Sequence, residues 1–171
     1  MINYKIPLLG ITAYSGTGKT TLLKRLIPEL LTMDIRCGLI KHSHHNMDID
    51  KPGKDSYELR KAGAAQTIVA CDQRWALMTE TPSQAVNLSE LAAQFNAELI
   101  DLVLVEGFKH EPIDKIALFR SSVGKPFEGL IDSDVIAVAT DDNLALNIPK
   151  LDINDPSTIA EFIKRWLKDR N

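Results

Sequence analysis

The most constraining feature of the chain is an apolar run that passes directly into a glycine-containing turn and then into the start of a helix. Residues 6–13 read IPLLGITA and residues 14–21 read YSGTGKTT. A phosphate-binding loop requires this order, because glycines let successive backbone N–H groups converge on one anion at a helix N-terminus. The segment therefore predicts phosphate binding, hence a nucleotide, with an inert Gly/Ser turn as the alternative.

Individual residues of this loop are expected to contact the phosphates or Mg²⁺. Those expected to hold the phosphates are Ser15, Gly16, Thr17, Gly18, Lys19, Thr20 and Thr21. The Lys19 ammonium would reach the terminal phosphates, and the Thr20 hydroxyl would ligate Mg²⁺. Ala13 stands where the pattern G-x-x-x-x-G-K-[ST] has its first glycine. Since alanine is the smallest substitute, we expect the loop still to close, with slightly altered geometry at its entry.

Length and composition favour one globular domain and exclude several other classes. The chain has 171 residues, 44% of them hydrophobic, and a formal net charge of −3. Such a charge disfavours a nucleic-acid surface, and no apolar stretch approaches the ~20 residues needed to cross a bilayer. Cys37 and Cys71 lack the spacing of a metal motif and suggest a reducing compartment. We expect a cytoplasmic protein with neither nucleic acid nor membrane as a partner.

Strand-like and helix-like segments alternate along the chain, which predicts a three-layer α/β domain. Residues 19–33 have helical spacing of leucines, and the continuous apolar run 99–105 is typical of a central parallel strand. Asp55 is expected to cap a short helix over residues 56–62. We therefore predict a P-loop NTPase fold with a mostly parallel central sheet, as a single nucleotide-binding domain over residues 1–171. An additional β-hairpin is expected as an insertion at about 66–79.

Acidic residues at two places are candidates for serving a bound nucleotide. Glu106 ends the strand over 99–105, at the edge where ligands of such sheets bind. There it would hold Mg²⁺ through water or orient an attacking water, and a solvent-facing carboxylate is the alternative. Asp101 begins the same strand and is expected to be structural. Asp48 and Asp50 alternate in a loop, where one would be a Mg²⁺ ligand or a base, or both would simply be solvated.

Three of the four histidines fall in a short tract that follows the second expected strand. They are His42, His44 and His45. With Asp48 and Asp50 they could bind a transition metal, or with Lys41 an anionic substrate. A polar loop without a ligand is the third reading, since histidine spacing alone is a weak signal.

Five segments, in this order, resemble the MobB family of molybdopterin-guanine dinucleotide biosynthesis adaptor proteins. They are the phosphate loop and residues 41–45, 50–56, 62–64 and 105–109. The resemblance spans nearly the whole chain. Its most specific parts are DKPGKDS at 50–56 and Glu-Gly-Phe-Lys at 106–109. Ala13 departs from the glycine that the family usually has.

The resemblance implies a GTP-binding protein of the SIMIBI group of P-loop NTPases, homodimeric and with weak GTPase activity at most. Members assist a separate nucleotidyltransferase that attaches GMP to molybdopterin, which forms the molybdenum guanine dinucleotide cofactor. The implied cofactors are GTP and Mg²⁺. The implied partners are that nucleotidyltransferase, and molybdopterin or a molybdoenzyme chaperone.

Carried over by position, the resemblance assigns roles to individual residues. The catalytic residues would be Lys19, Glu106 and Asp50, and the metal ligands Thr20, Glu106 and Asp50. Contacts to the pterin phosphate or to a partner protein would come from His42, His44, His45 and Lys54. The guanine motif Asn-Lys-x-Asp is absent. Asp141 and Asp142 are its candidate substitutes, because a carboxylate accepts hydrogen bonds from the guanine N1–H and amino group. The alternative is that these residues simply form a turn.

Two other functions remain open on the residues alone. A metallochaperone GTPase would use the His42–His45 tract to carry a metal ion to a target enzyme. A small-molecule P-loop kinase would transfer the γ-phosphoryl group. The kinase is less favoured because kinases of this kind usually carry an arginine-rich lid, and the sequence has no such cluster.

Overall fold

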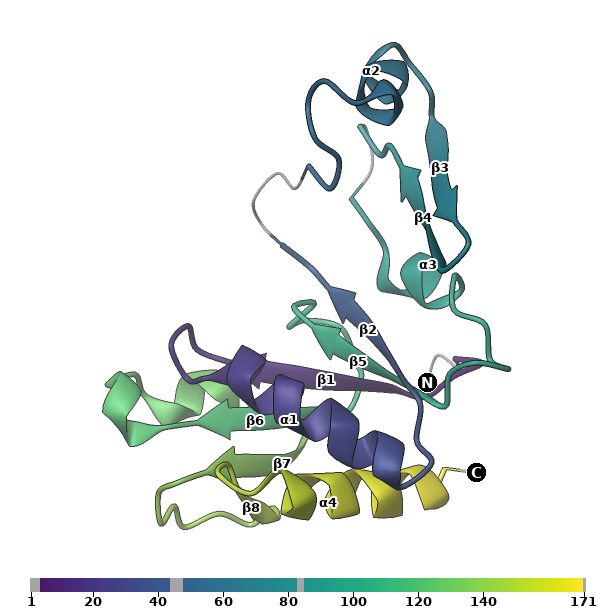
Figure 1. Cartoon of the computed structure of the whole chain (residues 1–171). Helices are drawn as coiled ribbons and strands as arrows, with labels where there is room; N and C mark the ends of the chain where they lie inside the picture. Colours follow the sequence, from purple (N-terminus) through teal and green to yellow (C-terminus); the bar gives the residue numbers. More distant parts are fainter. Residues whose placement is uncertain (1–3, 44–47, 83–84, 171) are drawn as a thin grey trace. The chain divides into compact units, whose positions relative to one another are not determined.

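The computed structural model describes residues 4–43, 48–82 and 85–170 (Figure 1). The chain divides into two compact units. The sheet unit comprises Met1–His42 and Leu88–Asn171, and the hairpin unit comprises Ser43–Asn87. The predicted hairpin is present, and it belongs to a unit larger than the insertion expected from the sequence.

The sheet unit is built on one six-stranded sheet with the order β2-β5-β1-β6-β7-β8. All of its strand pairs are parallel, which confirms the predicted parallel α/β architecture. The strands are β1 (Leu8–Ala13), β2 (Cys37–Lys41), β5 (Leu102–Glu106), β6 (Lys115–Phe119), β7 (Val135–Thr140) and β8 (Lys150–Asp152). Strand β8 was not foreseen, because three residues with a single apolar side chain show no readable periodicity.

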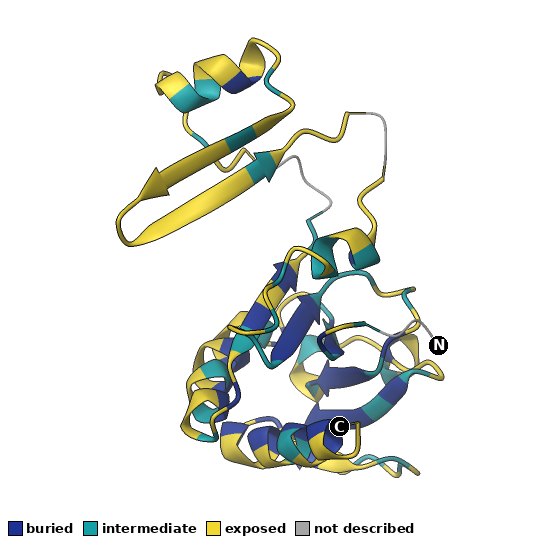
Figure 2. Ribbon diagram, turned by 90° about the vertical axis from the view of Figure 1, so that its right-hand side faces the viewer, coloured by how far each residue is buried: buried dark blue, intermediate teal, exposed yellow. Residues whose placement is uncertain are grey.

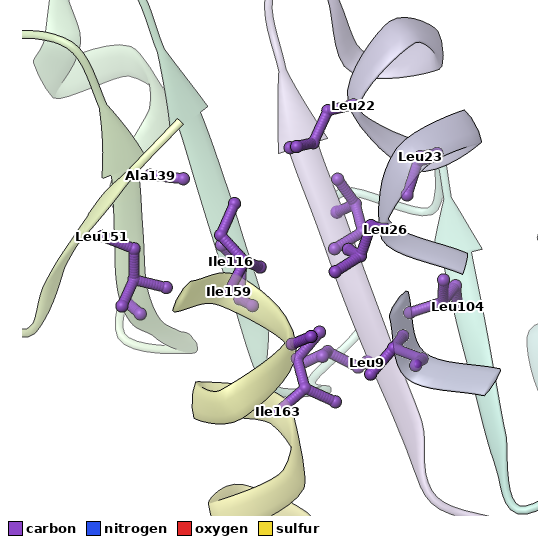
Figure 3. Close-up of a cluster of buried hydrophobic side chains, with 14 of the residues drawn as sticks. Leu9, Leu22, Leu23, Leu26, Leu104, Ile116, Ala139, Leu151, Ile159 and Ile163 are labelled. Carbon is purple, nitrogen blue, oxygen red and sulfur yellow. The ribbon is translucent and has the colours of Figure 1, made fainter. Parts of the chain in front are cut away.

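Two helices cover one face of the sheet, α1 (Lys19–Thr32) and α4 (Pro156–Lys168). Leu26 of α1 and Ile163 of α4 are fully buried against strand residues such as Leu104 (Figure 3). The Asp155 side chain accepts a hydrogen bond from the Ser157 N–H at 3.0 Å and so caps α4. Among the described residues, no helix combines the length and the apolar character needed to cross a membrane.

The opposite face of the sheet is covered by shorter pieces of chain. Helix α3 (Leu88–Ala92) places the fully buried Leu88 in one cluster with Val103 and Val105 of β5. The 3₁₀ segments η1 (Ser121–Val123) and η2 (Phe127–Leu130) follow β6, and Leu130 packs in a second cluster with Phe119. The predicted third layer is therefore thin, and loops supply much of it.

The hairpin unit contains α2 (Asp55–Lys61), β3 (Gln66–Cys71) and β4 (Arg74–Thr79). Strands β3 and β4 pair antiparallel. The prediction that Asp55 caps α2 is wrong, because Asp55 is the first helical residue and Lys54 occupies the cap without a side-chain hydrogen bond. An acid in the first helical turn still interacts favourably with the helix dipole.

A buried arginine connects the segments of the hairpin unit. Arg60 of α2 is 9% exposed and donates to Glu80 at 2.7 Å and to Asp48. These ion pairs join α2 to the loop before it and to the residues that follow β4. Most of the hairpin itself is exposed (Figure 2).

Candidate functional site

The phosphate loop joins β1 to α1 and has the backbone that anion binding requires. Gly16 and Gly18 have φ values of 87° and 88°, in the left-handed region that favours glycine. A Cβ at either position would meet no atom within 4 Å, so backbone conformation and not space demands these glycines. The Thr17 hydroxyl donates to the Tyr14 carbonyl at 2.9 Å, which tightens the turn.

Ala13 is accommodated because it belongs to the strand and not to the turn. It is the last residue of β1 and pairs with Leu118 of β6. Its backbone is therefore extended, a conformation that any residue adopts. The left-handed positions of the loop lie further on, at Gly16 and Gly18.

The lysine of the loop pairs with the acid at the end of the neighbouring strand. Lys19 Nζ lies 3.0 Å from Glu106 Oε1, and the two side chains are 21% and 15% exposed. Because β1 and β5 are adjacent and parallel, Glu106 ends at the same edge of the sheet as the phosphate loop. The structure thus places Glu106 beside the loop, as expected, and the solvent-facing alternative does not describe it. Asp101, at the opposite edge, pairs with Arg36 at 2.8 Å.

His42 lies at the same edge, because it directly follows β2, which pairs parallel with β5. Gly107 has a φ of 93°, and a Cβ there would lie 2.7 Å from the His42 Cβ. The His42 N–H donates to the Glu106 carbonyl at 2.8 Å, and the His42 ring lies 4.7 Å from the Phe108 ring. The glycine after Glu106 is therefore required both by its conformation and by the close approach of His42.

Several predicted site residues belong to the hairpin unit or lie outside the described residues. Asp50 Oδ1 accepts from the Lys51 N–H at 2.9 Å, and Asp50 Oδ2 is buried without a hydrogen-bond partner among the described residues. Lys54 precedes α2, where it occupies the cap position. The roles of Asp50 and Lys54 in a nucleotide site remain predictions. His44 and His45 lie outside the described residues.

Hard oxygen ligands suit Mg²⁺, so the Thr20 hydroxyl and the Glu106 carboxylate, both at the carboxyl edge of the sheet, fit that ion. Asp50 belongs to the hairpin unit, and its part in a Mg²⁺ site remains a prediction. Within residues 4–43, 48–82 and 85–170, no group of three or more His, Cys, Asp or Glu side chains is arranged to hold a metal ion. A Mg²⁺ site would therefore need oxygens of the nucleotide as well.

The two candidate guanine acceptors follow β7, and each makes a bond within the protein. Asp141 Oδ2 accepts from Arg120 at 2.8 Å, and Asp142 Oδ1 accepts from the Asn143 N–H at 2.7 Å. Their contact with guanine remains a prediction. Arg120 was not singled out from the sequence. The available signal was its place directly after the apolar strand β6, at the edge where ligands of parallel sheets bind.

A glycine-rich loop between a parallel strand and a helix, with its lysine paired to a strand-end acid, defines a P-loop nucleotide-binding fold. The family described as "Molybdopterin guanine dinucleotide synthesis protein B" (MobB) matches residues 8–141. The chain belongs to this family, which confirms the resemblance seen in its sequence.

The curated relatives match over nearly their whole length. The molybdopterin-guanine dinucleotide biosynthesis adapter protein of Escherichia coli (strain K12) is 61% identical over 168 residues, covering 97% of this chain and 96% of its own. The protein of the same name from Haemophilus influenzae is 57% identical over 166 residues, covering 97% and 92%.

Solved structures show the same fold at lower identity. A crystal structure of molybdopterin-guanine biosynthesis protein B superposes with a TM-score of 0.74 at 23% identity, covering 93% of this chain and 99% of its own. A MobB homologue from Bacillus stearothermophilus gives 0.71 at 23% identity, covering 95% and 98%.

Proposed function

We propose that this protein is a GTP-binding adaptor that assists a nucleotidyltransferase in attaching GMP to molybdopterin, which forms the molybdenum guanine dinucleotide cofactor. The observation that carries the proposal is the phosphate loop with Lys19 held at its mouth by Glu106 at 3.0 Å. Family membership supports the pathway, because the relatives from E. coli and H. influenzae are named as adapter proteins of this biosynthesis.

In this proposal the loop binds the GTP phosphates through its backbone N–H groups. Gly16 and Gly18 turn those groups toward one anion, and the N-terminus of α1 adds a partial positive charge. Lys19 exchanges Glu106 for a phosphate oxygen when the nucleotide enters. Thr20 and Glu106 would hold Mg²⁺, which would supply positive charge beside the phosphates, and Asp50 of the hairpin unit is a further candidate ligand.

Hydrolysis is proposed to be weak, so that the protein acts mainly as an adaptor. Catalysis of phosphoryl transfer needs a group that positions the attacking water and a cation that stabilises the transition state. Glu106 is the candidate for positioning water, and Lys19 is the cation beside it. An arginine finger has no candidate in the sequence pattern, which favours a slow reaction.

Contacts to the pterin phosphate or to the partner enzyme are assigned to the histidine tract and Lys54. His42 supports this part of the proposal because it lies beside Glu106 at the carboxyl edge of the sheet. Asp141 and Asp142 are the proposed guanine acceptors. The function is placed in the cytoplasm, where Cys37 and Cys71, both free thiols here, would stay reduced.

We also propose that the protein forms a homodimer through the hairpin. Ile68, Trp75 and Leu77 lie on one face of β3 and β4, because Ile68 pairs with Leu77 and Ala70 with Trp75. Ile68 and Trp75 are 65% and 67% exposed. A two-stranded sheet is marginally stable alone, and a second copy presents the same apolar face for mutual burial.

Light scattering should show a dimer that Trp75→Lys converts to monomer and that Gln73→Lys, in the turn, leaves intact.

Titration calorimetry tests nucleotide binding directly. GTP and ATP, each with Mg²⁺, are titrated into the wild type, into Lys19→Ala and into Lys24→Ala, an exposed lysine of α1 that serves as the matched control. We expect a preference for GTP that Lys19→Ala removes and Lys24→Ala retains. The wild type should also stimulate guanine dinucleotide formation by the nucleotidyltransferase. Failure both to bind GTP and to stimulate that reaction would refute the proposal.

A further inference from the structure

The guanidinium of Arg120 binds three separate loops at once. Its Nε donates to the Thr17 carbonyl of the phosphate loop at 3.2 Å. Nη1 donates to Asp141 Oδ2 and Nη2 to Asn154 Oδ1, each at 2.8 Å. Every nitrogen of the guanidinium therefore has a partner in a different segment of the chain.

The sheet order explains why one side chain reaches all three loops. Strands β1, β6, β7 and β8 are neighbours and run parallel, so their carboxyl ends lie along one edge. Arg120 directly follows β6, between the loop after β1 and the loops after β7 and β8. Ligands of open parallel sheets bind along this edge. Arg120 thus connects the phosphate loop to the loops in which the candidate guanine acceptors lie.

The hydrogen bonds of Arg120 contribute little to the free energy of folding. The side chains of Arg120 and Asp141 are 28% and 30% exposed, and ion pairs with such access to water contribute little to folding. Their effect is to fix the positions of the three loops relative to one another. Thr17 is only 2% exposed and Asn154 directly precedes the cap of α4, so two of the three partners are themselves held in place.

We propose that Arg120 is a positioning residue that orients the loops after β7 and β8 against the phosphate loop, and so selects the base of a bound purine nucleoside triphosphate. The inference rests on the GTP binding proposed above. Since Arg120 engages Asp141 through Oδ2, the carboxylate is held with Oδ1 as the oxygen that accepts from the guanine N1–H and amino group. Arg120 itself contacts protein and not the nucleotide.

Replacing the arginine with lysine separates geometry from charge. Arg120→Lys keeps the positive charge but cannot present a planar fork to three partners. Arg36→Lys is the matched control, because Arg36 likewise donates to a carboxylate, Asp101, and to a backbone carbonyl, that of Glu98, at the opposite edge of the sheet. Dissociation constants are measured for GTP, ATP and inorganic tripolyphosphate with each protein, and thermal unfolding confirms that each is folded.

We expect Arg120→Lys to weaken GTP binding by roughly tenfold and to lower the GTP-to-ATP affinity ratio by a similar factor. Tripolyphosphate, which lacks a base, should bind within about threefold of its wild-type affinity. Arg36→Lys should change none of these values. Asp141→Asn should lower the same ratio, and combining it with Arg120→Lys should lower it little further, since Arg120 acts on the base through Asp141.

An unchanged GTP-to-ATP ratio in Arg120→Lys, or equal affinities of the wild type for the two nucleotides, would overturn the inference. Additive effects of Arg120→Lys and Asp141→Asn on the ratio would also overturn it. Should Arg120→Lys fail to fold, Asp141→Asn and Asn154→Ala supply the same comparison. A wild type that binds neither GTP nor tripolyphosphate would instead refute the proposed nucleotide binding, and this inference with it.

Discussion

Replacing Glu106 with glutamine should strengthen GTP binding when Mg²⁺ is absent. The Glu106 carboxylate lies 3.0 Å from Lys19 Nζ, so a phosphate that binds Lys19 must displace it. At that distance and an effective dielectric constant of about 20, the attraction is roughly 5 kcal/mol before desolvation. Desolvation of both charges offsets most of this. For a partly buried pair we take a net ~1–2 kcal/mol, between the value of at most about 1 kcal/mol for exposed pairs and the roughly 3–5 kcal/mol lost on breaking a buried one. Glu106→Gln should therefore raise GTP affinity in EDTA about five- to thirtyfold.

Mg²⁺ should reduce this gain, because Glu106 is also proposed to hold the ion. Calorimetric titration of GTP in EDTA and in Mg²⁺ measures both effects, and Mg²⁺ should improve binding to Glu106→Gln less than to the wild type. Asp101→Asn is the matched control, since Asp101 immediately precedes the same strand and is also ion-paired, with Arg36. An equal or lower GTP affinity of Glu106→Gln in EDTA would refute the idea that Glu106 competes with phosphate for Lys19.

Three further predictions concern stability, measured by urea unfolding. Gly107→Ala should lower the free energy of unfolding by about 1–3 kcal/mol, because the new Cβ would lie 2.7 Å from the His42 Cβ and the backbone φ is 93°. A change of less than ~0.5 kcal/mol would contradict this. Leu26→Ala should lower the free energy of unfolding by about 2–5 kcal/mol, since Leu26 is fully buried. A loss of less than ~1 kcal/mol would contradict this and would mean that neighbouring core residues close the cavity. Hydrogen bonds from Arg36 lower the pKa of Asp101 from 3.8 to about 2. A carboxylate whose pKa is lowered in the folded protein stabilises the fold at pH values above its pKa in the unfolded chain. The free energy of unfolding of the wild type should therefore exceed that of Asp101→Asn near neutral pH, and this difference should be lost as the pH falls from about 4 to about 2. An advantage that stays constant down to pH 2 would contradict this.

The phosphate loop could be read from the sequence because its structure is local. An apolar strand, two glycines in the left-handed region and the first turn of a helix follow one another within residues 8–21, and each is encoded by its own residues. The same holds for α4, where Asp155 and Pro156 mark the helix start. Ala13 was harder to judge, since only the length of β1 shows that the position is extended.

Contacts between distant segments followed from the order of the strands. Because β5 and β6 flank β1 on its two sides, Glu106 meets Lys19 on one side and Arg120 meets Thr17 on the other. A strand's period states which face is buried but not which strand lies beside it. The sequence alone thus determined the phosphate loop, the parallel α/β class and the family. The direct ion pair between Lys19 and Glu106, and the arginine that joins the loops along the sheet edge, were decided by tertiary structure, because these contacts depend on how distant strands are ordered.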